Sequence, residues 1–324
     1  MAVTPTNPPP DLLTRRVGSL LAARIGPTQT LCVGLSGGCD SVTLLHLLCQ
    51  LGYRERLTAV HVHHGLSPHA DAWADFCTAY CADLGVPLIL RRVAVDRKSG
   101  SGLEAAARQA RYAVFAEIPG DWLLLAQHRG DQAETLLFNL LRGSGLTGAA
   151  GMPVQRVFAD KQLLRPLLAT PRAEIEAYAR QVGLAWIEDE SNADLGFSRN
   201  YLRHQTLVDL SQRFPAAESA LAQAAGHFAE AQGLLDELAA EDWARAAEGD
   251  SARLAVLKAL SLPRLKNLIR YRLRQLGWQP PVAARLNEFC RQIQTAGPDR
   301  HPALELPQGR MFCRHQRLFW QGLG

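Results

Sequence analysis

Short apolar runs alternate with amphipathic segments through the first 141 residues of the chain. An apolar run of four to eight residues is typical of a buried strand, whereas apolar positions three or four apart are typical of a helix. The pattern predicts a strand ending at Ser36, strands over 57–64, 87–95 and 122–127, and helices over 11–25, 41–50, 68–84, 104–118 and 131–141. Strands that alternate with helices form βαβ units, so we expect an α/β fold with a parallel sheet and helices on both faces.

The pattern changes after Gly151. Short strands are predicted over 163–168 and 184–187, on either side of a helix over 171–182, and a loop begins at Ser191. Residues 216–247 are rich in Ala with Leu at helical intervals, which favours one long linking helix. We therefore predict an α/β domain over 1–205, a linker helix region over 206–250 and a mainly helical, basic domain over 251–324.

Charge divides the chain into two unlike parts. Residues 251–324 contain 13 Lys and Arg against three acidic residues, a net of +10, whereas the first 250 residues contain 22 basic and 28 acidic residues, a net of −6. A basic terminal domain on a mildly acidic one suggests a polyanionic partner. A solvated basic face without a partner stays open on charge alone.

Hydrophobic residues make up 47% and charged residues 20% of the chain, as in ordinary globular proteins. No apolar stretch approaches the length of a membrane span, and the N-terminus lacks the basic and then apolar plan of a secretory signal. We expect a cytoplasmic protein that does not act at a membrane.

The seven cysteines lie scattered through apolar segments. An odd number in this setting favours reduced, buried thiols. Cys77 and Cys81 have the spacing C-x3-C on a predicted helix, but no second Cys or His pair at ligand spacing accompanies them, so a buried position is the better interpretation.

One motif follows the first predicted strand directly. Ser36-Gly37-Gly38-Cys39-Asp40-Ser41 forms a glycine turn between that strand and a helix. Such a turn directs backbone N–H groups and hydroxyls to one spot beside a helix N-terminus, where an anion is favoured. The loop lacks the lysine of a Walker motif, and Asp40 stands where a metal-bridged polyphosphate would need a carboxylate. The alternative is a turn that merely joins the two elements.

A second cluster follows the strand predicted over 122–127. His128 precedes Asp131 and Glu134, whose spacing places both carboxylates on one face of the first helical turn. They could hold Mg²⁺ or accept a proton, but acids in a first turn also serve as helix caps. His63 and His128 both fall at carboxyl ends of strands, where open sheets bind nucleotides.

Several arginines suit anionic groups. Glu104 and Arg108 have the spacing of a surface ion pair. Such a pair does not account for Arg111. Arg142, Arg199 and Arg203 stand near glycines or a helix start, and each alone is weak support for a site.

Together these residues resemble the tRNA(Ile)-lysidine synthase family of N-type ATP pyrophosphatases, which carry a PP-loop. Matching segments occur in order between residues 31 and 203. They read G-L-S-G-G-C-D-S (34–41), V-H-V-H-H-G-L (60–66), E-A-A-A-R-Q-A-R-Y (104–112), A-Q-H-R-G-D-Q-A-E-T (126–135), L-R-G-S-G (141–145), L-R-P-L-L (164–168), E-D-E-S-N (188–192) and S-R-N-Y-L-R (198–203). Ser67 departs from the basic residue that often follows H-G-L. Beyond residue 205 the chain shares only a helical and basic character with the family. This part of the chain is short, which suggests the compact form of the family, with one appended domain.

The resemblance implies a Rossmann-like sheet, the cofactors ATP and Mg²⁺, and L-lysine and tRNA(Ile) with a CAU anticodon as substrates. Lysine would be ligated to C2 of the wobble cytidine through an adenylated intermediate. The resemblance assigns nucleotide contacts to Ser36, Gly37, Gly38, Cys39, Asp40, Ser41, His63 and His128, metal binding to Asp40 and Asp131, and catalytic roles to Asp40, Asp131, Glu134, Arg111 and Arg199.

Other functions stay open at this point. A 2-thiocytidine synthetase typically needs paired C-x-x-C cysteines, which this chain lacks, and a small-molecule amidotransferase-type ligase would not need a +10 domain. An RNA-binding module with a vestigial nucleotide site is a third alternative, and the intact Ser36, Asp40, Ser41 and Asp131 argue against it. The oligomeric state is not determined by the sequence, and a homodimer is compatible with it.

Overall fold

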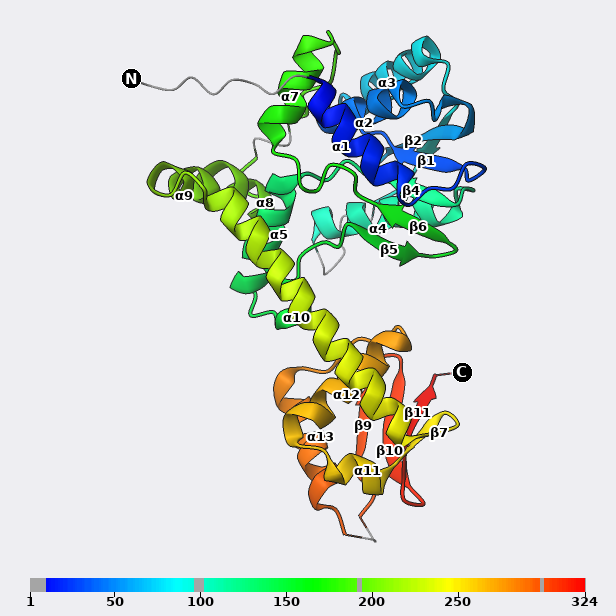
Figure 1. Cartoon of the computed structure of the whole chain (residues 1–324), viewed down its shortest axis with the longest axis vertical. Coiled ribbons are helices and arrows are strands. Elements are labelled where there is room, and N and C mark those ends of the chain that lie inside the picture. Colours follow the sequence, from blue (N-terminus) through cyan, green and yellow to red (C-terminus); the bar gives the residue numbers. More distant parts are fainter. Residues whose placement is uncertain (1–9, 96–101, 191–193, 298–299, 324) are drawn as a thin grey trace. The chain divides into compact units, whose positions relative to one another are not determined.

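A computed structural model describes residues 10–95, 102–190, 194–297 and 300–323, which form two compact units, 1–229 and 230–324. The boundary falls inside the longest helix, α10 (Ala217–Ala246), drawn yellow-green in Figure 1. This helix matches the long Ala-rich element expected over 216–247. Ser191 and Asn192, part of the E-D-E-S-N segment, lie outside the described residues.

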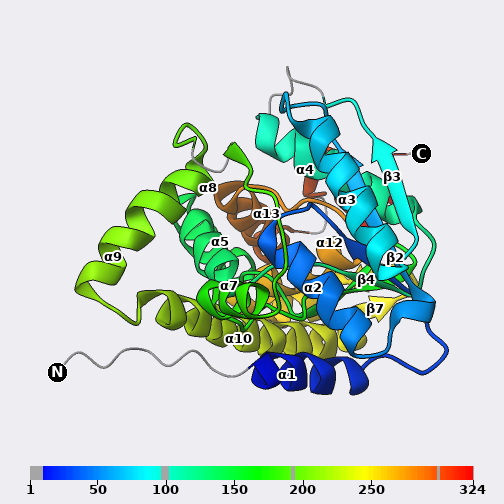
Figure 2. The same cartoon turned by 90° about the horizontal axis from the view of Figure 1, so that it is seen from above.

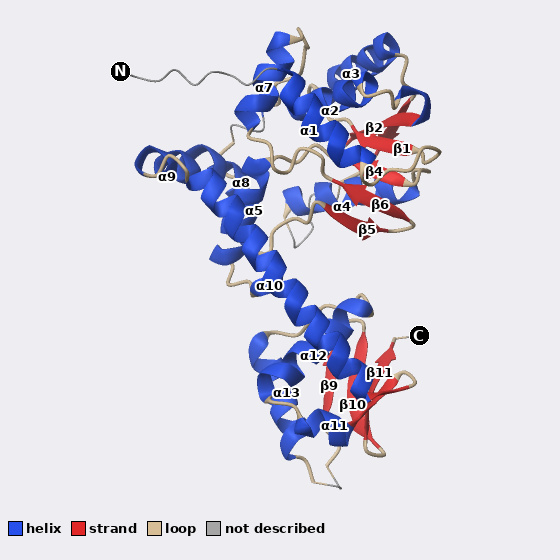
Figure 3. Ribbon diagram, in the orientation of Figure 1, coloured by secondary structure: helices blue, strands red, loops and turns tan. Residues whose placement is uncertain are grey.

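The first unit contains a six-stranded sheet of order β3-β2-β1-β4-β6-β5 (Figure 3). All neighbouring pairs are parallel except β5 with β6. The strands are β1 (Leu31–Gly34), β2 (Leu57–His63), β3 (Leu88–Arg92), β4 (Trp122–Leu124), β5 (Gln155–Phe158) and β6 (Lys161–Leu164). Since chain order reverses at β1, the carboxyl ends of β1 and β4 border the crevice where such sheets bind ligands.

Helices cover both faces of this sheet, which Figure 2 shows from above. On one face, Val17 of α1 and Leu44 of α2 pack with Val33 and Leu124 of the sheet. On the other face, Phe115 of α4 packs with residues that alternate with these along the strands, such as Cys32 and Leu123. The expected Rossmann-like arrangement is therefore confirmed.

The helices of the first unit are α1 (Pro10–Ala22), α2 (Cys39–Gln50), η1 (Arg54–Arg56), α3 (Ala70–Leu84), α4 (Leu103–Glu117), α5 (Arg129–Leu141), α6 (Leu146–Ala149), α7 (Arg172–Gln181), α8 (Ser198–Tyr201), the π-helical turn η3 (Leu202–Thr206) and α9 (Leu207–Arg213). Helices α1 to α5 and α7 match predicted helices with small shifts at their ends, whereas η1, α6, α8 and η3 fall where no helix was predicted.

The strand predicted over 184–187 was wrong. These residues adopt no strand in the structure, and the backbone N–H of Ile187 instead donates to the carbonyl of Gly37 at 2.9 Å. The side chain of Ile187 lies against Gly37, and Leu184 and Trp186 pack against the core of the first unit. β5 was not predicted, because its exposed Q-R-V-F sequence lacks the apolar run of a buried strand.

In its described residues, the second unit combines the C-terminal half of α10 and three further helices with a five-stranded sheet of order β7-β8-β11-β10-β9. All of its strand pairs are antiparallel. Its elements are β7 (Ala247–Glu248), β8 (Ser251–Arg253), α11 (Leu254–Ala259), α12 (Leu262–Gln275), α13 (Ala283–Thr295), β9 (Ala303–Leu306), β10 (Gly309–Arg314) and β11 (Arg317–Gly322). The helical, basic character was predicted correctly, whereas the sheet was not anticipated.

One face of this second sheet forms the core of the unit. Leu268 of α12 and Phe289 of α13 pack with Met311 and Leu318 of the sheet. His315 and Gln316, at the β10–β11 turn, have φ of 49° and 59°, which is the left-handed backbone that a two-residue hairpin turn requires.

No helix among the described residues is long and apolar enough to span a bilayer. All seven cysteines are buried and unpaired, as the sequence predicted.

Candidate active site

The glycine turn lies where the sequence places it, between β1 and α2. The Ser41 hydroxyl accepts from the backbone N–H of Ser36 at 3.1 Å and donates to the carbonyl of Gly38 at 3.0 Å. The Ser36 hydroxyl lies 3.0 Å from that of Ser41 and accepts from the N–H of Gly38 at 3.3 Å. These short bonds close the turn on itself and fix its backbone before any ligand arrives.

Gly37 has to be glycine for two reasons. Its φ is +90°, and a Cβ at this position would lie 2.5 Å from Cδ1 of Ile187. Gly38 is the N-cap of α2, and no side chain caps this helix end. The first N–H groups of α2 can therefore serve an anion, which the helix dipole also favours.

His128 caps α5 and has a defined tautomer. Its Nδ1 accepts from the N–H of Gly130 at 3.0 Å, so in the neutral ring the proton is on Nε2. Nε2 lies 3.8 Å from Oδ2 of Asp40 and 3.6 Å from Oδ2 of Asp131. The imidazole thus stands between the carboxylate of the glycine turn and that of α5.

The sequence left open whether Asp131 is a helix cap or part of a polar site, and its contacts fit both. Its Oδ2 accepts from the backbone N–H of His128 at 2.9 Å, which is a helix cap. Its Oδ1 accepts from Nη2 of Arg203 at 3.0 Å. The same carboxylate therefore caps α5 and belongs to a cluster of charged side chains.

Glu134 is the most buried carboxylate of this cluster, with only 3% of its side chain exposed. Nε of Arg203 donates to Oε1 at 2.6 Å and Nη2 to Oε2 at 3.0 Å. Burial raises the pKa of Glu134, and the bound Arg203 opposes that shift. Burial likewise raises the pKa of Asp40, against the nearby His128 and Arg172.

The sequence named Arg203 only as one of several arginines suited to anionic groups and assigned it no role in the site. Arg203 belongs to the π-helical turn η3, an irregularity often found at functional sites. The sequence signal that could have pointed to Arg203 is its position four residues after Arg199, on the same helical face. Two carboxylates 69 and 72 residues away cannot be paired with it from local pattern.

The two predicted arginines lie outside this cluster and make other contacts. Nε of Arg199 lies 3.2 Å from Oε1 of Glu104, and its guanidinium lies 5.5 Å from the ring centre of Phe138. Nε of Arg111 donates to Nε2 of His64 at 3.3 Å. Burial and the Arg111 charge lower the pKa of His64 to about 4, so this ring is a neutral acceptor.

His63 is buried at the carboxyl end of β2. Its Nε2 lies 3.2 Å from Oδ1 of Asp71, and Arg92 donates to Asp71 at 2.7 Å. Thus the structure gathers Asp40, His128, Asp131 and Glu134 into one cluster, while the contacts of His63 are with the α3 and β3 side of the sheet.

Several buried polar side-chain atoms at this sheet edge have no partner among the described residues. In the part of the chain that the structure describes, four such atoms belong to segments at these strand ends: Asp40 Oδ1, His64 Nδ1, Gln127 Oε1 and Thr135 Oγ1. Buried polar atoms are normally satisfied, so these require a ligand or water. The sequence analysis did not select Gln127 or Thr135.

The donor set fits a phosphate-bound magnesium ion. Within the described residues no group of three or more His, Cys, Asp or Glu is arranged to hold a metal by itself. Mg²⁺ is commonly bound through one or two carboxylates together with substrate phosphates and water. The unpartnered Oδ1 of Asp40, beside a turn suited to phosphate, meets that requirement.

The thiols of Cys39, Cys77 and Cys81 stay protonated near neutral pH. Burial raises the pKa of Cys39 to about 11, that of Cys77 to about 12 and that of Cys81 to about 11. Cys77 contacts His61 at 3.4 Å between Sγ and Nδ1. The C-x3-C pair is therefore part of the core, as the sequence favoured.

The sheet and its strand–turn–helix site define a PP-loop ATP-binding protein. A family model described as PP-loop domain matches residues 12–210, and one described as TilS substrate binding domain matches residues 253–319. The U34-tRNA thiolase NcsA from Methanococcus maripaludis has the same fold, with a TM-score of 0.55 at 18% identity over 68% of this chain and 79% of that one.

The chain belongs to the tRNA(Ile)-lysidine synthase family. It is 49% identical to the tRNA(Ile)-lysidine synthase of Aromatoleum aromaticum, over 91% of this chain and 69% of that protein. It is 47% identical to that of Alkalilimnicola ehrlichii, over 96% of this chain and 71% of the relative. The chain thus spans about 70% of the length of these relatives.

Proposed function

We propose that this chain ligates L-lysine to C2 of the wobble cytidine in the CAU anticodon of tRNA(Ile), with ATP converted to AMP and diphosphate. The observation that carries the proposal is the cluster of Asp40, His128, Asp131 and Glu134 beside the glycine turn. Membership of the family disfavours a 2-thiocytidine synthetase or a non-catalytic RNA-binding module.

ATP would bind with its β- and γ-phosphates on the Ser36–Ser41 turn. The C2 oxygen of cytosine is a poor leaving group and has to be activated before lysine can displace it. It attacks the α-phosphorus of ATP and releases diphosphate, which leaves an adenylated base. The N–H groups at the start of α2 would stabilise the departing charge, because they are fixed before the reaction. His128 would contact the nucleotide through its Nε2 proton.

Magnesium would be held by Asp40, with Asp131 as the second carboxylate candidate. When bound, it neutralises charge on the polyphosphate. Oδ1 of Asp40 is the available ligand atom, whereas both oxygens of Asp131 already accept hydrogen bonds.

Lysine attacks C2 through its ε-amine, and AMP leaves. The amine has an unperturbed pKa of about 10.4, so it arrives protonated and must lose a proton. Asp131 and Glu134 are the carboxylates that would hold the ammonium and accept its proton. A carboxyl whose pKa is raised, as that of Glu134 is by burial, is the better proton acceptor at neutral pH.

The arginines would serve the anionic groups of the substrates. Arg111 and Arg199 are proposed for the α-phosphate and the lysine carboxylate, and His63 for a nucleotide contact. Arg199 would have to leave Glu104, with which it forms a partly exposed ion pair. Exposed pairs contribute only about 0–1 kcal/mol, so that exchange costs little.

The second unit would hold the tRNA. Residues 253–319 match a substrate binding domain, and residues 251–324 carry a net charge of +10. The target cytidine has to be unstacked to reach the catalytic cluster. Since tRNA is the substrate, we expect the chain to act in the cytoplasm.

The test is a reaction of the purified chain with ATP, Mg²⁺ and lysine on tRNA(Ile) transcripts. Mass analysis of the digested nucleosides should find lysidine in the CAU transcript and none in a transcript with a CAG anticodon. Unmodified cytidine in the CAU transcript, with a folded protein, would contradict the proposal.

A further inference from the structure

The sheet of the second unit has one face that the core does not use. Along β10 the inward Met311 and Cys313 are buried, whereas Arg310 and Arg314, which alternate with them, are exposed. Register places the outward residues of the other strands beside these. We call this surface the outer face, formed by Glu248, Arg253, Ala303, Glu305, Arg310, Phe312, Arg314, Arg317, Phe319 and Gln321.

Two aromatic rings occupy the middle of the outer face. Phe312 and Phe319 are directly opposite each other on β10 and β11, and their rings stack with centroids 5.4 Å apart at 19°. The guanidinium of Arg310 lies 4.5 Å from the ring centre of Phe312. Both rings are only partly buried, and neither belongs to a hydrophobic core cluster among the described residues.

Positive charge surrounds the aromatic pair. The outer face carries four arginines and two acidic residues, Glu305 and Glu248, and Glu248 forms an ion pair with Arg317. A surface of this kind is complementary to a polyanion, and partly exposed rings flanked by arginines suit bases and riboses as well as phosphates.

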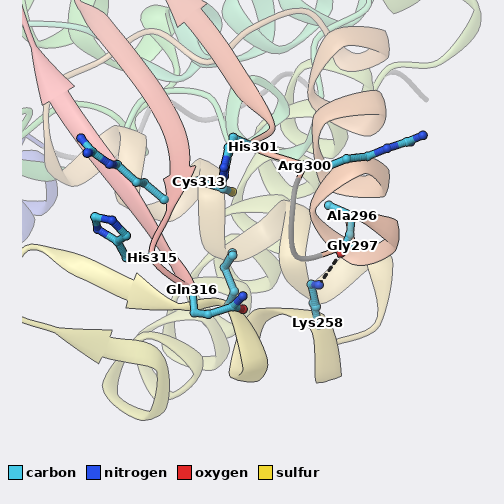
Figure 4. A pocket seen from close by; sticks show the side chains of 10 residues that line it. Lys258, Ala296, Gly297, Arg300, His301, Cys313, His315 and Gln316 are labelled. Atoms are coloured by element: carbon cyan, nitrogen blue, oxygen red, sulfur yellow. Dashed lines mark hydrogen bonds between the residues drawn. The ribbon is translucent and has the colours of Figure 1, made fainter.

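The β10–β11 turn extends this basic character to one end of the sheet. A cavity of about 190 Å³ lies there, and none of its described lining residues is acidic (Figure 4). Lys258 donates to the carbonyl of Ala296 at 2.7 Å, and Arg300 extends away from the cavity. Arg314 belongs both to this cavity and to the outer face.

We propose that the outer face is the RNA-contacting surface of the second unit. Its arginines contact phosphates, and the Phe312–Phe319 pair contacts unpaired nucleotides of the tRNA. This inference rests on the proposed function, because it assigns a place on the chain to the tRNA that the reaction requires.

The test compares single variants of the full chain in tRNA binding. Arg310→Ala and Arg314→Ala each remove one proposed phosphate contact, and Phe319→Leu removes a ring but keeps an apolar side chain. Arg291→Ala is the matched control, because it removes the same charge from an exposed position on α13. Affinity for tRNA(Ile) is measured by fluorescence anisotropy from low to physiological salt.

Each outer-face arginine variant should lower the salt slope of log affinity by about 0.7–0.9, as expected for one lost phosphate contact. Phe319→Leu should weaken binding about fivefold or more without changing that slope. Arg291→Ala should leave both quantities near those of the parent chain. The proposal would be overturned if Arg291→Ala and Arg314→Ala changed tRNA affinity equally, or if the outer-face variants bound tRNA like the parent chain. Either result would favour a protein as the partner of this face.

Turnover separates this proposal from the proposed function. Lysine-dependent AMP release at saturating tRNA should keep its kcat in the outer-face variants, while the KM for tRNA rises. If the parent chain makes no AMP, the proposed function fails, and the binding data still decide whether the outer face contacts RNA.

Discussion

Arg203 and Glu134 form a two-point ion pair, with Nε and Nη2 of the arginine 2.6 and 3.0 Å from the two carboxylate oxygens. The pair joins the π-helical turn η3 to the first turns of α5. It holds in place a carboxylate that burial would otherwise tend to neutralise. We infer that Arg203 keeps Glu134 ionised and oriented for the lysine amine.

Arg203→Gln should shift the pH dependence of lysine addition. Glu134 must be ionised to accept a proton, so the rate falls as pH falls through its pKa, which burial raises. Removal of the Arg203 charge raises that pKa further, so the acid limb moves to higher pH. The measurement is kcat/KM for lysine between pH 5.5 and 9 in both proteins.

The matched control for this experiment is Arg180→Gln. Arg180 also pairs with a glutamate, Glu176, but on the exposed surface of α7, where such pairs contribute little. Its pH profile should superimpose on that of the parent chain. If Arg203→Gln leaves the acid limb in place and lowers the KM for lysine, the inferred role is wrong. Arg203 would then compete with the lysine ammonium for the carboxylates.

Asp131→Asn should abolish most activity and leave the fold intact. The asparagine oxygen can still accept from the N–H of His128, so the α5 cap is retained, but the charge is lost. We expect lysine-dependent AMP release to fall by about 10²–10⁴, the usual range for a lost acid–base group. Asp160→Asn, on an exposed turn, should change the rate by less than about twofold.

Gly37→Ala and Gly38→Ala should separate the two neighbouring glycines. An alanine at 37 would have to adopt a φ of +90° and displace Ile187, whereas a Cβ at 38 would meet nothing closer than 3.6 Å. Gly37→Ala should cost about 1–3 kcal/mol of unfolding free energy and abolish ATP binding. Urea titration measures the free energy of unfolding, and a nucleotide-binding assay measures the affinity for ATP. Equal stabilities of the two variants would contradict the assigned strain.

Cys39→Ala should retain activity although the residue lies inside the glycine turn. The thiol is buried, and burial raises its pKa to about 11, so it does not supply a thiolate near neutral pH. We expect kcat within about threefold of the parent chain, because the turn uses backbone groups at this position. Rapid inactivation of the parent chain by iodoacetamide, prevented by Cys39→Ala, would show that the thiol is reactive.

Local pattern was enough to predict the elements that support the site. The run of apolar residues before Ser36 and the helical spacing after it place the glycine turn between β1 and α2, because each element depends on neighbours in sequence. The Ala-rich spacing predicted α10 for the same reason. The strand order, which makes the ends of β1 and β4 adjacent, requires contacts between distant segments.

The rest depended on pairings that no local signal reveals. Arg203 was one of several arginines until the fold brought it to Glu134. The sheet of the second unit was missed because its strands are short and half exposed, so that Arg310-Met311-Phe312 does not resemble a buried run. Ile187 was assigned to a strand from its apolar neighbours, although the turn at Gly37 provides its packing partner.

The identity of the nucleotide product tests the central claim most directly. ATP labelled at the α-phosphate is incubated with the purified chain, Mg²⁺, lysine and tRNA(Ile), and the products are separated. The account predicts labelled AMP, formed only when lysine and the CAU transcript are both present. Labelled ADP, or AMP formed equally without lysine and tRNA, would contradict it.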